Sequence, residues 1–163
     1  MDIQTQKTMF SSKSNEWETP QDFFNKLDRI YKFTLDPCAT PENYKCEKHY
    51  TSEDDGLSKS WKDETVFVNP PYGDIGSWVR KAHYEATTND ATVVMLIPSR
   101  TDTKYWHDYI MKSASGIYFI KGRLKFNNDQ GITNAAPFPS AVIVFVSTKY
   151  RWANGPTVRT MER

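Results

Sequence analysis

A four-residue set with two prolines follows an apolar run and could hold a planar amino group. The set is Asn69-Pro70-Pro71-Tyr72, and Val68 ends the run before it. Two prolines fix the backbone in an extended shape, because proline locks φ and restricts the residue before it. The Asn69 amide oxygen and the Pro70 carbonyl then form a rigid pair of acceptors suited to an exocyclic NH₂ group, with Tyr72 nearby to stack on it. The alternative is a proline-braced strand end with Tyr72 in the core.

A second polar segment follows the short strand predicted at residues 33–35. Asp36 stands at the tip of this strand, and Pro37 forces a turn directly after it. In open α/β sheets, ligands bind beyond the carboxyl ends of the strands. These two strand ends are therefore the first candidates for a site.

Acidic and basic side chains separate along the chain, although its net charge is only +1. Residues 36–64 hold eight acidic and four basic side chains, whereas residues 100–126 hold six basic and two acidic ones. The first stretch suits a cationic ligand, and the second suits phosphates. Each could equally be the solvated face of a helix, so charge alone does not decide between these interpretations.

Helix and strand patterns alternate around these segments, which predicts an α/β sheet with helices on both faces. Thr19 supplies a capping hydroxyl and Pro20 a first helical residue, and apolar side chains follow at helical spacing. The last two strands have no helix between them, so we expect an antiparallel pair at one edge. The predicted helices cover residues 20–30, 77–87 and 101–112, and the predicted strands cover 33–35, 65–68, 92–97, 116–120 and 141–146.

The 163 residues fit one ordinary domain, and 38% hydrophobic residues suffice for a stable core. We expect residues 16–150 to form this domain. Residues 1–15 and 151–163 have little to bury, so we expect them to be loose tails.

The composition favours a cytoplasmic protein that needs neither a membrane nor a metal. The first residues lack the apolar stretch of a signal peptide, and the longest apolar run, 141–146, is far shorter than a membrane span. Cys38, Cys46 and His49 could be metal ligands, but a fourth ligand at usable spacing is missing. We therefore expect no metal site and interpret the cysteines as small buried side chains.

Several motifs in the same order resemble one enzyme family. The chain from Trp17 to Val146 resembles the small phage-type DNA N6-adenine methyltransferases of the Dam family, and Asn69-Pro70-Pro71-Tyr72 looks like their catalytic motif. Cofactor elements precede this motif, which resembles the gamma arrangement of these enzymes. The other segments that carry the resemblance are Trp17-Glu18-Thr19-Pro20, Asp36-Pro37-Cys38-Ala39, Asp54-Asp55-Gly56-Leu57 with Trp61, Pro98-Ser99-Arg100-Thr101-Asp102 with Trp106, and Gly122-Arg123-Leu124-Lys125-Phe126.

The resemblance implies a compact Rossmann-like class I methyltransferase sheet, reduced in size, and S-adenosylmethionine as the cofactor. It implies that the segment before the first helix closes over the methionine end of this cofactor. The implied catalytic residues are Asn69, Pro70, Pro71 and Tyr72. The implied cofactor-binding residues are Trp17, Thr19, Pro20, Asp36, Pro37, Cys38, Ala39, Asp54, Asp55 and Asn69.

The sequence departs from the wider methyltransferase pattern after the first strand. Thr40-Pro41-Glu42-Asn43 occupies the place of the usual glycine-rich turn, and only 33 positions separate Asp36 from Asn69. There is little room for the usual second and third β/α units. The contact to the ribose or adenine end of the cofactor could come from Asp54, from Asp55 or from neither.

Double-stranded DNA is the partner that the resemblance implies, in the host cytoplasm if the chain is phage-encoded. A base inside a duplex cannot reach the site, so we expect the adenine to be flipped out and stacked on Tyr72, with Phe126 as a second surface. The expected DNA contacts are Arg100, Arg123, Lys125 and Phe126. For the basic residues Arg123 and Lys125, the alternative is a role in salt bridges. The candidate base-reading stretch, residues 127–139, includes Asn127, Asn128, Gln130 and Asn134, and an ordinary surface loop is the alternative.

In the implied reaction, the two acceptors orient the lone pair of adenine N6 toward the methyl group, and neither a metal nor a covalent intermediate is needed. The same residues could hold any planar NH₂ group. A methyltransferase acting on RNA adenine or a protein glutamine amide is therefore one alternative, and a non-catalytic nucleic-acid-binding relative is another. The recognition sequence stays open, as does the choice between monomer and dimer.

Overall fold

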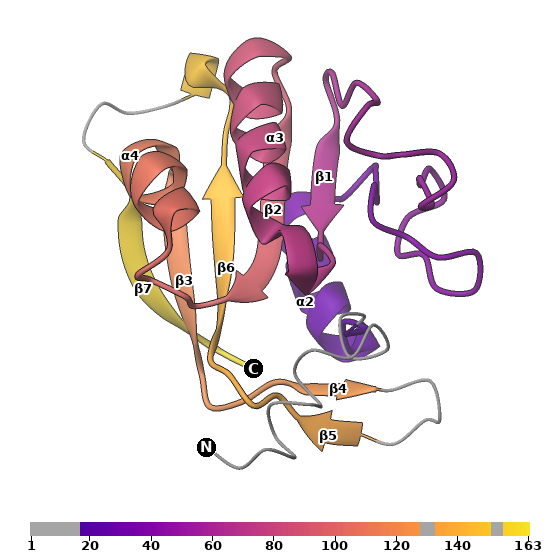
Figure 1. Ribbon diagram of the computed structural model, residues 1–163, viewed down its shortest axis with the longest axis vertical. Coiled ribbons are helices and arrows are strands. Elements are labelled where there is room, and N and C mark those ends of the chain that lie inside the picture. The colour runs from indigo at the N-terminus through magenta and orange to yellow at the C-terminus, as the bar shows by residue number, and fades with distance from the viewer. Residues whose placement is uncertain (1–16, 128–132, 151–154) are drawn as a thin grey trace.

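A five-stranded sheet forms the centre of the molecule (Figure 1). The computed structural model describes residues 17–127, 133–150 and 155–163. Across the sheet, the strands follow the order β1-β2-β6-β3-β7. Their bounds are Thr65–Val68 for β1, Thr92–Pro98 for β2, Gly116–Lys121 for β3, Ser140–Phe145 for β6 and Thr157–Glu162 for β7.

Four of these strands run in one direction, and β6 runs against them. β1 pairs with β2 and β3 pairs with β7 in parallel, while β6 is antiparallel to both β2 and β3. The antiparallel strand expected from the sequence is present, but it lies inside the sheet rather than at an edge. Every residue of β6 is buried, because both faces of this strand are covered. Its long apolar run is typical of such a strand.

Helices cover both faces of the sheet, which confirms the predicted α/β class. α2 (Gln21–Tyr31) and α3 (Ile75–Thr88) begin and end within two residues of their predicted bounds. The predicted helix 101–112 instead starts late, because Thr103 donates to the carbonyl of Arg100 and closes a turn. A π-helical turn, η3 (Trp106–Ile110), and the short helix α4 (Met111–Ser113) follow. None of the described helices is long and apolar enough to cross a membrane.

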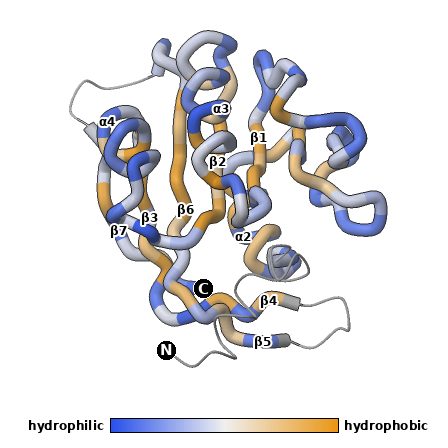
Figure 2. Tube along the Cα trace, in the orientation of Figure 1, coloured by the Kyte–Doolittle hydropathy of each residue, from blue (hydrophilic) through white to orange (hydrophobic). Residues whose placement is uncertain are grey.

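Two apolar clusters fill the space between the sheet and its helices. In β1, Val66 and Val68 belong to the cluster that includes α3, whereas Phe67 belongs to the cluster that includes α2. Successive side chains of a strand point to opposite faces, so β1, β2, β3 and β6 each contribute to both clusters. Figure 2 shows the result as hydrophobic colouring along β2 and β6.

Residues 37–64 lie beside β1 and form no helix and no strand of the sheet (Figure 1). The strand predicted at 33–35 is reduced to isolated bridges, Leu35 with Val66 and Asp36 with His49. Pairing with β1 stops at Pro37, because proline has no N–H to donate. The segment is therefore held by individual contacts rather than by a ladder.

Two further strand pairs lie toward the C-terminal half of the chain. β4 (Lys125–Asn127) and β5 (Thr133–Ala135) form an antiparallel hairpin beyond the ends of β3 and β6 (Figure 1). β7 pairs with β3 where the sequence predicts a loose tail. Its side chains are almost all exposed, so no apolar periodicity marks it as a strand. A 3-10 turn at Thr148–Tyr150 precedes it.

Candidate active site

A cavity of about 530 Å³ opens beside the end of β1 and joins the two strand ends singled out in the sequence. This volume lies in the range of small-molecule sites. Both polar segments contribute to its wall, although 33 positions separate Asp36 from Asn69. Of the residues predicted to bind a cofactor, the wall includes Trp17, Thr19, Asp36, Pro37, Cys38, Ala39, Asp55 and Asn69, but neither Pro20 nor Asp54.

Asn69 presents an acceptor that no described residue uses. Its Nδ2 donates to the carbonyl of Trp17 at 2.5 Å, which fixes the orientation of the amide. Its Oδ1 is buried and has no hydrogen-bond partner among the described residues. Pro71 is extended, with φ −60° and ψ 130°, as predicted for a double-proline turn. A buried acceptor without a partner is costly, so this oxygen is suited to a ligand that brings a donor.

Asp36 differs from Asn69, because both oxygens of its carboxylate are used within the protein. Oδ1 accepts from the backbone N–H of Cys38 at 3.1 Å, and Oδ2 accepts from that of Lys45 at 2.9 Å. The side chain is only 4% exposed. Burial raises the pKa of Asp36, and these two hydrogen bonds and the nearby His49 and Lys45 only partly oppose the increase. Burial also raises the pKa of the Cys38 thiol well above its usual value.

The two neighbouring acids, Asp54 and Asp55, are placed differently. Asp54 is exposed, and its Oδ2 accepts from the backbone N–H and the hydroxyl of Thr51 at 2.8 and 3.1 Å. These bonds lower the pKa of Asp54 and give it a local role in a turn. Asp55 has a positive φ of 54° and lies in the cavity wall. Of the two acids, only Asp55 lines the cavity.

Acidic side chains outnumber basic ones around the cavity. Among the described residues, Lys45 is the single basic one in the wall, and its Nζ donates to Gln21 Oε1 at 2.9 Å. Burial lowers the pKa of Lys45, while the nearby Glu18 and Asp36 oppose this shift. The acidic residues of the wall are Glu18, Asp36, Glu42 and Asp55. This balance favours a ligand with positive charge.

The aromatic residues near Asn69 are more deeply buried than the sequence suggests. Tyr72 is 7% exposed, and its ring lies edge-on to Phe138 with centroids 5.2 Å apart. Burial raises the pKa of Tyr72 despite the nearby Arg100. Phe126 is 1% exposed and packs edge-on against Trp17 at 5.5 Å. Phe126 therefore supports Trp17 from within the core and presents no open face.

Buried polar atoms without a partner gather at one end of the sheet. Asn69 follows β1, Ser99 follows β2, and Ser140 pairs in register with the last residue of β2. Such atoms are rare in folded proteins, and a cluster of them is typical of a place where ligands bind. The full set among the described residues is Thr19 Oγ1, Asn69 Oδ1, Tyr72 OH, Ser99 Oγ, Tyr105 OH and Ser140 Oγ.

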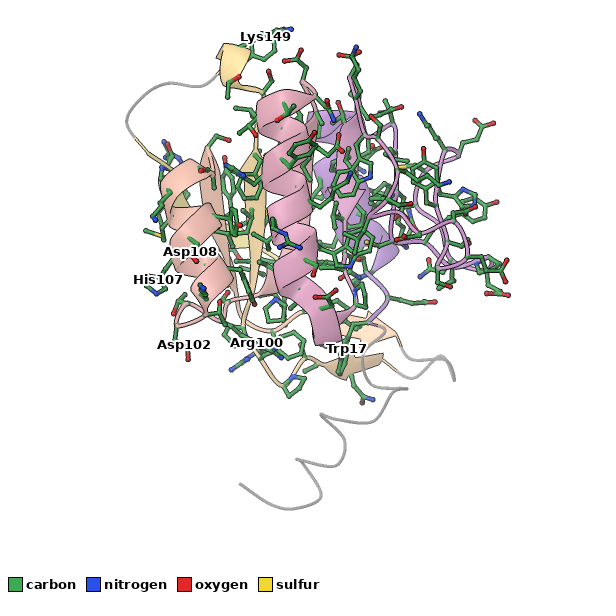
Figure 3. All side chains as sticks on the ribbon, turned by 45° about the horizontal axis from the view of Figure 1, so that its top comes forward. Trp17, Arg100, Asp102, His107, Asp108 and Lys149 are labelled. Carbon is green, nitrogen blue, oxygen red and sulfur yellow. The ribbon has the colours of Figure 1, made fainter. Side chains whose placement is uncertain are left out.

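The predicted DNA contacts lie outside the cavity wall. Arg100 is exposed directly after β2, and Figure 3 shows it at the same end of the molecule as Trp17. Arg123 and Lys125 are exposed and alternate with buried Leu124 and Phe126, as a period of two predicts. In the candidate base-reading stretch, Asn134 is exposed, whereas Asn128 and Gln130 lie outside the described residues and Asn127 is described only in its backbone.

Sequence reasoning missed several residues of the wall. Lys45, Trp78 and Gly56 line the cavity, but their spacing gives no signal, since tertiary contacts alone bring them together. For Gly56 and Glu18, the signal in the sequence was their place in segments that carry the family resemblance. Within the described residues, no group of three or more His, Cys, Asp or Glu side chains could hold a metal ion.

Comparisons with known proteins point in the same direction as the motifs. A family model described as DNA N-6-adenine-methyltransferase (Dam) matches residues 6–160. A DNA N-6-adenine-methyltransferase of Haemophilus phage HP1 is 31% identical over 133 residues, which cover 79% of this chain and 76% of the relative. A protein of the same name from Escherichia phage T1 is 34% identical over 110 residues, which cover 66% of this chain and 45% of the relative.

Proposed function

Because the chain belongs to the DNA N-6-adenine-methyltransferase (Dam) family, we propose that it transfers a methyl group from S-adenosylmethionine to N6 of a flipped-out adenine in DNA. The observation that carries the proposal is the buried Oδ1 of Asn69 beside the cavity, which lacks a hydrogen-bond partner among the described residues. An adenine amino group supplies the missing donor.

We propose that the cavity binds S-adenosylmethionine, which supplies a methyl group activated by a positively charged sulfur. Its sulfonium and ammonium groups fit a wall with four acidic residues and one lysine. Asp36 accepts from the backbone N–H groups of Cys38 and Lys45 and so fixes the chain that follows it. Its buried negative charge favours a cationic ligand, and Asp55 faces the same space.

The chemical role of Asn69 and Pro70 is to stabilise developing charge on N6. The N6 lone pair is delocalised into the adenine ring, so the amine must become pyramidal before it attacks the methyl group. Asn69 Oδ1 and the Pro70 carbonyl each accept one N6 hydrogen and hold the lone pair toward the methyl group. The hydrogen bond from Asn69 Nδ2 to Trp17 prevents the amide from turning its donor toward the substrate. Neither group is a base at neutral pH, so the proton that N6 loses leaves to water.

DNA binding is assigned to the exposed basic residues near the strand ends. Arg100, Arg123 and Lys125 contact phosphates in this proposal, and Tyr72 forms the aromatic surface beside the flipped base. The burial of Asn69 Oδ1 supports base flipping, because a stacked base in a duplex cannot reach this atom. The hairpin β4–β5 lies at the same end of the sheet as the C-terminal end of β2 (Figure 1) and is the candidate for reading sequence.

The substrate class is tested by incubating the protein with labelled S-adenosylmethionine and equal amounts of double-stranded DNA, RNA and protein. We expect label in DNA only, and N6-methyladenine after the DNA is hydrolysed. Label in RNA or in protein would replace the proposal by the corresponding alternative. DNA binding without any transfer would identify a non-catalytic relative.

A further inference from the structure

The outer wall of the cavity is built from a segment without regular structure. Residues 37–64 contain no helix and no strand of the sheet, yet Pro37, Cys38, Asp55 and Gly56 all line the cavity. Long irregular segments in compact domains are usually functional, and they need specific contacts to stay in place. The contacts that hold this wall therefore decide the shape of the cavity.

Trp61 is the main anchor of the segment. It is fully buried, and its indole Nε1 donates to the carbonyl of Gly56 at 3.0 Å. Its ring lies parallel to that of Trp78 on α3, with centroids 6.2 Å apart and an interplanar angle of 20°. Trp61 thus joins the irregular segment on one side to α3 on the other.

Glu85 on α3 holds this anchor by its backbone. The carboxylate is 1% exposed, and Oε2 accepts from the backbone N–H of Trp61 at 2.9 Å and from Asn89 Nδ2 at 2.8 Å. Oε1 pairs with Lys81 Nζ at 2.6 Å, which compensates the buried charge. The same ammonium lies 5.4 Å from the centre of the Trp61 ring. All of these partners come from α3, the turn that follows it, or Trp61 itself.

Gly56 transmits the position of Trp61 to the turn after Asp36. A Cβ atom at residue 56 would lie 2.2 Å from the carbonyl oxygen of Pro37, far inside van der Waals contact. The two backbones therefore touch directly, and only glycine permits this approach. Because the Trp61 indole holds the Gly56 carbonyl, a displacement of Trp61 would disturb the contact between Gly56 and Pro37.

One helix consequently controls both sides of the site. α3 begins just after the turn that carries Asn69, and Glu85 lies near its C-terminal end. We propose that Glu85 is a positioning residue for the methyl donor, which holds the Pro37–Cys38 wall of the cavity through Trp61 and Gly56. The identity of the ligand rests on the proposed function, whereas the chain of contacts does not.

Calorimetry with S-adenosylhomocysteine tests the inference without relying on turnover. Glu85→Leu removes both acceptors, and we expect its Kd for S-adenosylhomocysteine to rise about tenfold or more, because small shifts of a wall weaken a preorganised site. Glu85→Gln keeps an acceptor for the Trp61 N–H, so we expect its Kd to stay within about threefold of the wild type. The KM for DNA should not change in either variant, since the wall faces the cofactor side.

Gly56→Ala acts at the other end of the chain of contacts and keeps the test decisive if Glu85→Leu does not fold. We expect the same loss of affinity, of about tenfold, from a single added methyl group. Val144→Ala is the control for lost stability, because Val144 is a buried residue of β6 in the opposite cluster. It should lower the Tm and leave the Kd within about twofold.

The outcomes distinguish the positioning role of Glu85 from the identity of the ligand. Weaker binding by Glu85→Leu and by Gly56→Ala, with normal binding by Val144→Ala and Glu85→Gln, supports the positioning role of Glu85. Wild-type affinity in folded Glu85→Leu, wild-type affinity in Gly56→Ala, or equal weakening by Val144→Ala overturns it. A wild-type protein that binds no S-adenosylhomocysteine overturns the proposed function and this inference together.

Discussion

Asp36 and Asn69 each follow the end of a pairing segment and share one cavity, but their oxygens are used in opposite ways. Asp36 accepts from two backbone N–H groups, whereas Asn69 Oδ1 accepts from no described residue. A satisfied buried carboxylate stabilises its own turn, and an unsatisfied buried acceptor stabilises nothing until a ligand arrives. We infer that Asp36 shapes the binding site of the methyl donor, whereas Asn69 takes part in the chemistry.

Replacing Asn69 should have the largest effect. We expect Asn69→Ala to lower kcat about 10²-fold or more, as for the loss of one preorganised hydrogen-bonding group at a reaction centre. The Kd for S-adenosylmethionine should change little, because the amide serves the substrate. Labelled methyl transfer and calorimetry measure the two quantities. Asn25→Ala, on the exposed face of α2, is the matched control and should keep full activity.

Replacing Asp36 should produce the reverse pattern. Asp36→Ala leaves the N–H groups of Cys38 and Lys45 without acceptors and removes a negative charge from the wall. We expect the Kd for S-adenosylmethionine to rise about tenfold and the Tm to fall, because each unsatisfied donor costs about 1–3 kcal/mol. An unchanged Kd would show that Asp36 does not contribute to binding of the cofactor, in contradiction to the role that separates it from Asn69.

Replacing Arg100 tests whether this exposed residue contacts DNA and has no effect on the cofactor. We expect Arg100→Ala to raise the KM for DNA several-fold and to reduce the slope of log K against log salt by about one, the value for a single lost phosphate contact. Its Kd for S-adenosylmethionine should equal that of the wild type. A variant with an unaltered salt slope would show that Arg100 does not contact phosphate.

The burial of Asp36 also predicts a pH dependence of stability. Because its pKa is raised in the folded state, the folded protein binds more protons than the unfolded chain above the ordinary value of 3.8. The contribution of Asp36 to stability is therefore lost as the pH rises from 3.8 toward the raised pKa. Asp36→Asn should lack this loss. Urea unfolding of both proteins across this window measures the difference, and identical pH profiles would contradict the assignment.

The smallest effect should come from Asp54. Asp54→Asn removes a charge at the surface, keeps one side-chain oxygen that can accept from Thr51, and leaves the cavity wall intact. We expect its Kd for S-adenosylmethionine to stay within about twofold, whereas Asp55→Asn should weaken binding more, because it removes charge beside the ligand. The opposite ranking would assign the cofactor contact to Asp54.

The parts of the fold that apolar patterning controls could be predicted from the sequence. β1, α2 and α3 follow their periodicities closely, because burial of a regular apolar face determines them. β7 escaped prediction, since exposed side chains carry no such pattern and pairing with β3 depends on tertiary placement. The interior position of β6 was missed, although its unbroken apolar run is typical of a strand buried on both faces.

The site was predictable where strand ends and prolines control it. Asn69 and Asp36 were expected near one another, and the cavity brings both into its wall. Glu85 could not be found in this way, because its contact with Trp61 spans 24 positions and depends on how residues 37–64 fold against α3. The burial of Phe126 was equally hidden, since it follows from packing against Trp17.

The most direct test of the proposed chemistry is the rate constant of methyl transfer in a single turnover, with S-adenosylmethionine and DNA both saturating. The comparison uses wild type, Asn69→Asp and Asn69→Ala, because aspartate keeps an acceptor while alanine keeps none. The account predicts that the rate constant falls in that order, with alanine slowest by about 10²-fold or more. A rate constant for Asn69→Ala equal to that of the wild type would contradict the account.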